Sequence, residues 1–253
     1  LNIINHQSLI ATKTARVVQE AGGGVMEFGL RRAQGPDAGI YGARAAMIGG
    51  CIGTSNVLTG QLFDVPVKGT HAHSWIMSFP DEYTAFKKYS ELYPDACILL
   101  VDTYDTLKSG VPNAIRVFTE MREAGIPLTF YGIRLDSGDL AYMSKKARKM
   151  LDEAGWPECQ ISVSNSLDEH LIQNLLLQGA EIDMFGVGER MITAKSEPVF
   201  GGVYKLTAVE NEKGEIVPKI KCSENVEKIT IPHFKKVYRL YNRDNGKAIA
   251  DYM

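Results

Sequence analysis

Two histidines two positions apart, His71 and His73, are the residues of this chain best suited to chemistry. They belong to the stretch Lys68-Gly69-Thr70-His71-Ala72-His73-Ser74-Trp75, which follows a short apolar run and has too few apolar side chains for a core strand. An imidazole has an ordinary pKa of about 6.5, so near neutral pH it can transfer a proton, bind a metal or attack phosphorus. We expect residues 65–70 to form a strand and the two histidines to lie at its end.

Several uses of this histidine pair remain open. On an extended backbone, residues two apart share a face, so the pair suits a zinc site, but the spacing shows no third ligand. A His73 that accepts phosphate or transfers a proton, with Asp102 orienting its ring, needs fewer assumptions. The commoner fate of a histidine is a structural place in the interior or at the surface.

Polar residues and glycines follow each of the other predicted strands. These stretches are Phe28-Gly29-Leu30-Arg31-Arg32, Asp102-Thr103-Tyr104-Asp105, Arg134-Leu135-Asp136-Ser137-Gly138-Asp139, Ser164-Asn165-Ser166 and Phe185-Gly186-Val187-Gly188-Glu189. Arginines can clamp phosphate, glycines let backbone N–H groups approach it, and carboxylates suit ribose hydroxyls or Mg²⁺. Simpler roles are open too, because the arginines can be solvated, the glycines can mark turns, and Asp139 can cap the next helix.

Strands and helices alternate along most of the chain, which predicts a parallel sheet in an α/β barrel or a doubly wound fold. The expected strands are 25–28, 65–70, 96–102, 128–135, 161–163 and 184–187, and the expected helices are 8–20, 36–47, 80–92, 111–124, 140–154 and 168–178. In such folds the carboxyl ends of the strands face one rim, so we expect the polar stretches to converge there.

The last part of the chain has a different character. Residues 203–206 and 237–240 look like antiparallel strands around a charged hairpin at residues 211–214. We expect a single domain with an α/β barrel core over residues 1–202 and a barrel-associated β-rich segment over residues 203–253.

Composition excludes several classes of protein. The chain has 253 residues and a net charge of −2, which gives no general attraction to nucleic acid or to an anionic membrane. Its four cysteines have no metal-type spacing, so we expect free thiols and a cytoplasmic location, and no apolar run is long enough to span a bilayer. The chain starts at Leu1 without an initiator methionine, and we expect it to be a fragment of a longer polypeptide.

Six motifs follow one another along the chain. They are Glu27-Phe28-Gly29-Leu30-Arg31-Arg32-Ala33, Gly53-Thr54-Ser55-Asn56, Gly69-Thr70-His71-Ala72-His73-Ser74, Val101-Asp102-Thr103-Tyr104-Asp105, Arg134-Leu135-Asp136-Ser137-Gly138-Asp139 and Gly186-Val187-Gly188. In this order they resemble the motifs of the nicotinate phosphoribosyltransferase family. The resemblance implies an irregular parallel α/β barrel of the type II phosphoribosyltransferases, with a few antiparallel strands near the C-terminal end. It also implies that nicotinate and 5-phosphoribosyl 1-diphosphate give nicotinate mononucleotide and diphosphate in NAD salvage. The resemblance further implies that Mg²⁺ and ATP take part and that ATP hydrolysis is coupled through a phosphohistidine.

The resemblance also implies roles for individual residues. His73 is similar to the phosphohistidine, Asp102 to its acidic partner and Asp136 to the carboxylate that holds the ribose. Phe28 resembles the aromatic that stacks on the pyridine ring. The implied substrate-binding residues are Phe28, Arg31, Ser55, Thr70, Ser74, Arg134, Ser137, Gly138, Ser164, Asn165, Gly186 and Gly188, and no metal-ligating residue is implied. Family enzymes are longer and are expected to form homodimers, in which an N-terminal tyrosine of one subunit reaches the ring site of the other.

Two other functions stay open beside this one. The first is action on nicotinamide, whose amide offers N–H donors and favours a nearby carboxylate, whereas the nicotinate anion is repelled by one. The similar nicotinamide enzymes carry Asp in the region of Gly53-Thr54-Ser55, so Ser55 favours nicotinate. The second is a catalytically silent barrel fragment that retains the motifs of its parent.

Overall fold

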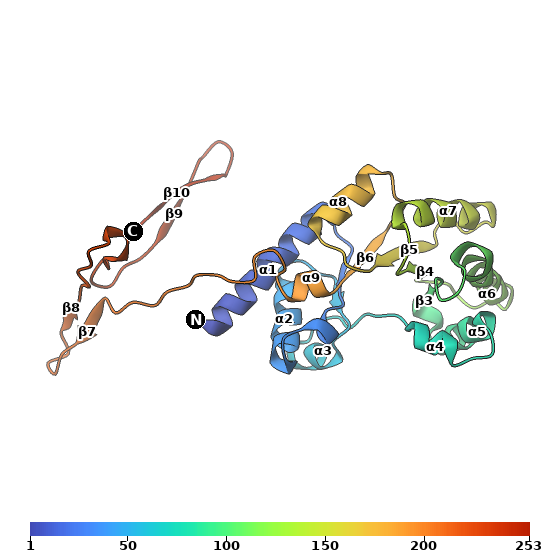
Figure 1. Cartoon of the computed structure of the whole chain (residues 1–253), viewed down its shortest axis with the longest axis horizontal. Coiled ribbons are helices and arrows are strands. Elements are labelled where there is room, and N and C mark those ends of the chain that lie inside the picture. Colours follow the sequence, from blue (N-terminus) through green and yellow to red (C-terminus); the bar gives the residue numbers. More distant parts are fainter. The chain divides into compact units, whose positions relative to one another are not determined.

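The structure is a computed structural model that describes residues 1–253, and the chain forms two compact units. One unit comprises Asn2–Phe200, and the other comprises Gly201–Met253 together with Leu1 (Figure 1).

The larger unit is built on a six-stranded parallel sheet with the strand order β2-β1-β6-β5-β4-β3. The strands are β1 (Val25–Glu27), β2 (Gly53–Thr54), β3 (Cys97–Leu100), β4 (Tyr131–Leu135), β5 (Gln160–Ser164) and β6 (Met184–Val187). The sheet curls into half a barrel (Figure 1). The strand order leaves β2 and β3 as its two edges. The predicted parallel α/β barrel class is therefore confirmed.

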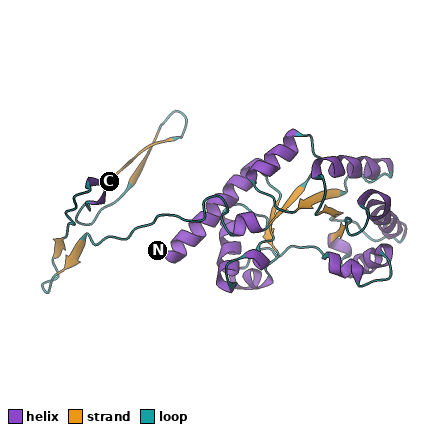
Figure 2. Cartoon of the chain, in the orientation of Figure 1, coloured by secondary structure: helices purple, strands orange, loops and turns teal.

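Helices lie around the curled sheet, as Figure 2 shows. They are α1 (Asn2–Ala21), α2 (Pro36–Ile48), α3 (Val57–Phe63), α4 (His73–Met77), α5 (Glu82–Leu92), α6 (Val111–Glu123), α7 (Leu140–Glu153), α8 (Glu169–Leu177) and α9 (Glu189–Ile192). Asp81, Asp139 and Asp168 each accept a hydrogen bond from the backbone N–H three residues later, at 2.8, 3.0 and 2.9 Å. These N-caps satisfy N–H groups that have no partner inside the helix, which fixes where α5, α7 and α8 begin.

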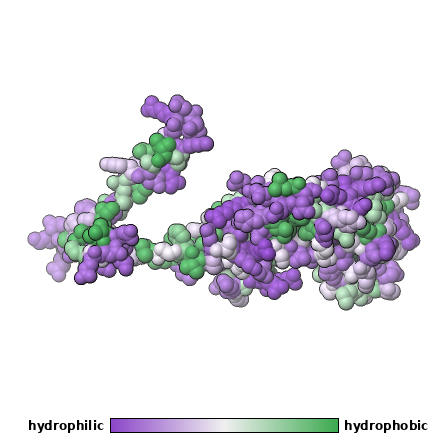
Figure 3. All heavy atoms as spheres, turned by 45° about the horizontal axis from the view of Figure 1, so that its top comes forward, coloured by the Kyte–Doolittle hydropathy of each residue, from purple (hydrophilic) through white to green (hydrophobic).

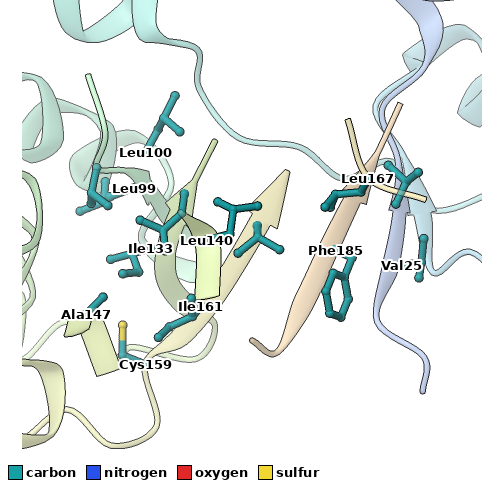
Figure 4. Close-up of a cluster of buried hydrophobic side chains, with 14 of the residues drawn as sticks. Val25, Leu99, Leu100, Ile133, Leu140, Ala147, Cys159, Ile161, Leu167 and Phe185 are labelled. Carbon is teal, nitrogen blue, oxygen red and sulfur yellow. The ribbon is translucent and has the colours of Figure 1, made fainter. Parts of the chain in front are cut away.

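The core lies mainly between the sheet and the helices. Strand register places Val25, Phe185 and Val163 side by side on the helix-facing side of the sheet. Figure 4 shows part of this cluster. Because side chains alternate along a strand, Met26 and Met184 fall on the inner face, where they form a smaller cluster.

The predicted strand over residues 65–70 is wrong. Only Val67 pairs with the sheet, through a single bridge to Thr54. In this bridge the Thr54 N–H donates to the carbonyl of Pro66 at 3.0 Å, and the Lys68 N–H donates to the carbonyl of Thr54 at 2.9 Å. Pro66 has no N–H to contribute to a ladder, so the pairing stops there. The segment continues to the other edge, where the Nε2 atom of His71 accepts the Leu100 N–H of β3 at 3.2 Å.

The smaller unit consists of two hairpins. Strand β7 (Ala208–Glu210) pairs with β8 (Ile216–Pro218), and β9 (Tyr238–Tyr241) pairs with β10 (Ala248–Tyr252), both antiparallel. The hairpin at residues 211–214 was predicted correctly, but its first strand is 208–210 rather than 203–206. The strand expected at residues 237–240 is 238–241, and it pairs with residues 248–252 instead. Asn211 sets this register because its side chain accepts the N–H groups of Lys213 and Glu215.

The hairpins have little core of their own. Nearly every apolar side chain of this unit is exposed, among them Tyr204, Phe234 and Val237, and Figure 3 shows such hydrophobic residues on its surface. That this segment associates with the barrel stays a prediction. In neither unit is there a helix with the length and apolar character needed to cross a membrane.

Candidate active site

His73 lies at the rim of the half-barrel as the first residue of α4. Its Nδ1 atom is 3.1 Å from the hydroxyl of Thr103, and its Nε2 atom is 3.9 Å from Oδ1 of Asp102 and 3.6 Å from Oδ2 of Asp136. The imidazole is 40% exposed, whereas the Asp102 side chain is 2% exposed. An accessible imidazole is therefore held between a hydroxyl and two carboxylates.

His71 has a different environment. Its ring is buried, packs edge-on against Tyr89 with centroids 4.5 Å apart, and accepts the Leu100 N–H. Burial lowers the pKa of His71 to about 4, so the ring is neutral at physiological pH. His71 is a structural residue, and the two imidazoles do not form the shared face that a zinc site would need. No cluster of three or more His, Cys, Asp or Glu side chains is placed to hold a metal ion.

Asp102 and Asp136 are fixed by hydrogen bonds at the ends of β3 and β4. Oδ2 of Asp102 accepts the backbone N–H of Asp136 at 2.9 Å and the hydroxyl of Ser137 at 2.5 Å. Oδ1 of Asp136 accepts the hydroxyl of Ser164 at 2.5 Å. The remaining oxygen of Asp102, Oδ1, is buried without a hydrogen-bond partner and lies on the side of His73.

Arg134 ties the strand ends together. Its guanidinium donates to Ser164 at 2.9 Å and to Thr70 at 2.8 Å, and lies 3.2 Å from Oδ1 of Asp136. It also lies over the ring of Phe28, 5.4 Å from the centroid. A single arginine thus links β4, β5, the histidine loop and the aromatic ring after β1.

A cleft of about 120 Å³ opens beside this arginine. It is lined by Phe28, Arg31, Arg32, Arg134, Asp136, Ser164, Asn165, Ser166, Gly186, Gly188 and Glu189. A Cβ atom on Gly186 would lie 2.6 Å from the Phe28 ring, so a glycine is needed for the ring to sit there. Asn165 and Ser166 have φ angles of 91° and 52°, which are unusual for non-glycine residues and typical of functional turns.

The geometry agrees with what comparison with known proteins shows. The model of the nicotinate phosphoribosyltransferase (NAPRTase) family matches residues 24–232. This chain belongs to that family. Nicotinate phosphoribosyltransferase of Bacillus subtilis is 57% identical over 254 residues, which cover 100% of this chain and 51% of the relative. The Caenorhabditis elegans protein of the same name is 36% identical over 310 residues, covering 100% of this chain and 54% of that protein.

Solved structures show the same fold. Human nicotinic acid phosphoribosyltransferase superposes with a TM-score of 0.77 at 31% identity, over 98% of this chain and 55% of the human one. Nicotinate-nucleotide pyrophosphorylase of Pyrococcus furiosus superposes with a TM-score of 0.67 at 25% identity, over 93% of this chain and 60% of that one. The chain spans about half the length of the curated relatives it matches. The resemblance predicted from the sequence motifs is confirmed.

Not every residue that the nicotinate phosphoribosyltransferase motifs predicted reaches the cleft. Ser137 and Thr70 contact the site through Asp102 and Arg134. Ser55 and Ser74 are exposed and lie outside the cleft lining, Ser55 donating its backbone N–H to the carbonyl of Glu27 at 3.0 Å. Gly138 shapes the turn before α7 with a φ angle of 78°.

Several residues of this site lie in the predicted polar stretches but received no individual role from the sequence. Thr103, which follows Asp102 in one of the family motifs, contacts His73 through its hydroxyl. Ser166 and Glu189 line the cleft. The side chain of Arg32 lies 3.9 Å from that of Glu189, whereas Arg31 forms no ion pair. Asp139, which also suited a ribose or magnesium ligand, is the N-cap of α7.

Proposed function

We propose that the native polypeptide carrying this chain is a nicotinate phosphoribosyltransferase of NAD salvage. It joins nicotinate to 5-phosphoribosyl 1-diphosphate, forms nicotinate mononucleotide and diphosphate, and couples this to ATP hydrolysis through phosphorylated His73. The observation that carries the proposal is the accessible imidazole of His73 beside Asp102, Asp136 and Thr103, at the edge of the cleft that contains Arg134 and Phe28.

The surroundings of His73 favour one nitrogen as the phosphate acceptor. Two carboxylates face Nε2, at 3.9 and 3.6 Å, and so favour the tautomer with its proton on that atom. The lone pair of Nδ1 is then the nucleophile, and attack on the γ-phosphorus of ATP forms an N–P bond while the bond to the bridging oxygen breaks and ADP leaves. Water later takes the phosphoryl group, which releases phosphate and restores the imidazole.

The aromatic end of the cleft suits nicotinate. The ring of Phe28, backed by the Arg134 guanidinium, offers a face on which a pyridine can stack. The exposed guanidinium of Arg31 is not engaged by a carboxylate of the protein, so it is free to bind the carboxylate of nicotinate. The backbone turns at residues 164–166 and 186–188 supply N–H groups for the phosphate side.

The carboxylates fit a role for Mg²⁺. Asp102 and Asp136 are oxygen ligands of the type this ion prefers, and Oδ1 of Asp102 is buried without a hydrogen-bond partner. Mg²⁺ is usually held by one or two carboxylates together with substrate phosphates, and when bound it would neutralise charge on the diphosphate. A homodimer and a cytoplasmic location stay predictions.

Phosphohistidine labelling tests the proposal. With γ-labelled ATP the native polypeptide should acquire an acid-labile phosphate that a His73→Ala variant lacks. A His71→Gln variant, whose amide oxygen can still accept the Leu100 N–H, should retain it, as should His170→Ala, which removes an exposed imidazole of α8 and is the matched control. Label that survives in His73→Ala, or that is lost only in His71→Gln, would show that the acceptor is misassigned. Absence of nicotinate mononucleotide when all substrates are supplied would favour a catalytically silent protein.

A further inference from the structure

Glu27 is a buried carboxylate that the proposed chemistry does not use. It is the last residue of β1, its exposure is 0%, and no lysine, arginine or histidine forms an ion pair with it. Burial raises the pKa of Glu27, and hydrogen bonds from Thr54 and Gly29 oppose that rise. Burying a carboxylate without a cationic partner destabilises a fold, so its presence calls for a reason other than packing.

The two oxygens of Glu27 hold two different loops. Oε1 accepts the backbone N–H of Gly29, and Oε2 accepts the hydroxyl of Thr54 at 2.6 Å. The Thr54 oxygen in turn accepts the backbone N–H of Asn56 at 3.0 Å. The carbonyl of Glu27 accepts the N–H of Ser55 at 3.0 Å, so side chain and backbone of one residue fix both the loop after β1 and the loop after β2.

These two loops carry the residues at the aromatic end of the site. Phe28 and Arg31 follow Glu27, and Ser55 lies between Thr54 and Asn56. Alternation along β1 puts Val25 and Glu27 on the helix-facing side and Met26 on the inner side. Glu27 therefore supports the loops from behind and does not reach the cleft, whose lining it does not join.

The two acceptor oxygens of the carboxylate explain why glutamate occupies this position. An ionised carboxylate is acceptor-only and can serve two donors at once, whereas an amide of the same shape presents one acceptor and one donor group. Gly29 has little room to move, because a Cβ on it would lie 2.4 Å from that of Ile192. A neutral side chain would therefore leave a donor of one loop without its acceptor.

We propose that Glu27 is the positioning residue of the pyridine-binding end of the site, setting the separation between the loops of Phe28 and Ser55. This rests on the proposed function, since it assigns nicotinate to that end. It makes Glu27 and Thr54 determinants of nicotinate affinity although neither touches the substrate. The side chain of His73 contacts Thr103 and lies near Asp102 and Asp136, so its phosphorylation should not depend on Glu27 or Thr54.

The test compares Glu27→Gln and Thr54→Val with wild type in the native polypeptide. Both should raise the KM for nicotinate by about tenfold, the effect expected when the loosened loops hold the binding geometry only about a tenth of the time. The KM for 5-phosphoribosyl 1-diphosphate and the labelling of His73 by ATP should stay unchanged. Thr54→Ser keeps the hydroxyl and should restore the affinity, and the double variant should be no worse than the single ones, because both remove the same contact.

The matched control is Glu169→Gln, the same chemical change at a buried carboxylate that pairs with Lys13 at 2.7 Å, away from the cleft. It should lower stability without raising the KM for nicotinate selectively. Hydrogen exchange supplies a readout that needs no activity: the amides of Gly29 and Ser55 should exchange faster in Glu27→Gln and at the wild-type rate in Glu169→Gln.

Unchanged exchange at these amides, or a KM rise shared by all substrates, would overturn the role of Glu27. A wild-type protein that forms no nicotinate mononucleotide would instead overturn the proposed function. In that case faster exchange at Gly29 and Ser55 would still show that Glu27 holds the two loops, while the assignment to pyridine binding would fall. The two failures are therefore distinguishable.

Discussion

Replacing Gly186 by alanine should damage the site through the ring of Phe28. The new Cβ would lie 2.6 Å from two ring carbons, about 0.8 Å short of the 3.4 Å at which ordinary contact begins. The strand cannot yield easily, because Gly186 pairs with Met26 of β1 and Ser164 of β5 within the sheet. The half-buried ring must move by a comparable distance into the cleft, away from its place beside the Arg134 guanidinium.

A misplacement of about 1 Å in a positioned group can reduce activity by about a hundredfold. We therefore expect Gly186→Ala to lower kcat/KM for nicotinate by about ten- to a hundredfold. The loss of stability should stay at about 1 kcal/mol, the low end for overpacking, because the ring has the cleft to move into. Steady-state kinetics and thermal unfolding of the native polypeptide measure both quantities.

The control for this prediction is Gly201→Ala. Its new Cβ would meet nothing within 4 Å, and the backbone there does not have a positive φ angle. Both kinetics and stability should match wild type. If Gly186→Ala folds normally and converts nicotinate as well as wild type does, the Phe28 ring does not form the pyridine site, and the stacking argument fails.

Two further predictions concern charge. Ser55→Asp places a carboxylate at an exposed position beside the ring-binding loops. Water screens it there, so the repulsion between two anions should weaken nicotinate by at most about 1 kcal/mol, while nicotinamide loses less or gains. An unchanged ratio of kcat/KM values for the two substrates would mean that Ser55 does not face the ring substituent. Burial holds the pKa of His71 at about 4, below its ordinary value of 6.5, so the unfolded chain binds the proton more readily and stability is lost as the pH falls through this range. Denaturant unfolding should show a decrease of about 2 kcal/mol between about pH 7 and pH 5, and this decrease should be smaller in His71→Gln.

The sequence predicted those parts of the fold in which burial and local propensity favour the same element. The apolar strand at residues 96–102 and the capped helix at residues 140–154 are two examples. The strand expected at residues 65–70 was wrong because its apolar residues do not form a ladder and only Val67 meets an edge strand. Strand β2 has two residues, too few for any periodic pattern to indicate it.

The candidate site, too, was predicted from the sequence only in part. Ordered motifs predicted that Phe28, Arg134 and Asp136 would meet, since strand ends in a parallel sheet share one rim. Spacing alone could not separate His71 from His73, because their difference comes from tertiary burial against Tyr89 and β3. Contacts such as Thr103 with His73 depend on the register between distant segments.

The segment from Pro66 to His73 joins the two open edges of the curled sheet, because Pro66 and Lys68 pair with Thr54 of β2 while His71 holds the N–H of Leu100 in β3. The backbone that leads into His73 is thus set only when both edges exist. Strands β2 and β3 lie at opposite ends of the sheet order, with four strands between them. On the proposed function, labelling of His73 by ATP would therefore also report completed assembly, because a chain that lacks either edge has the histidine but not its neighbours.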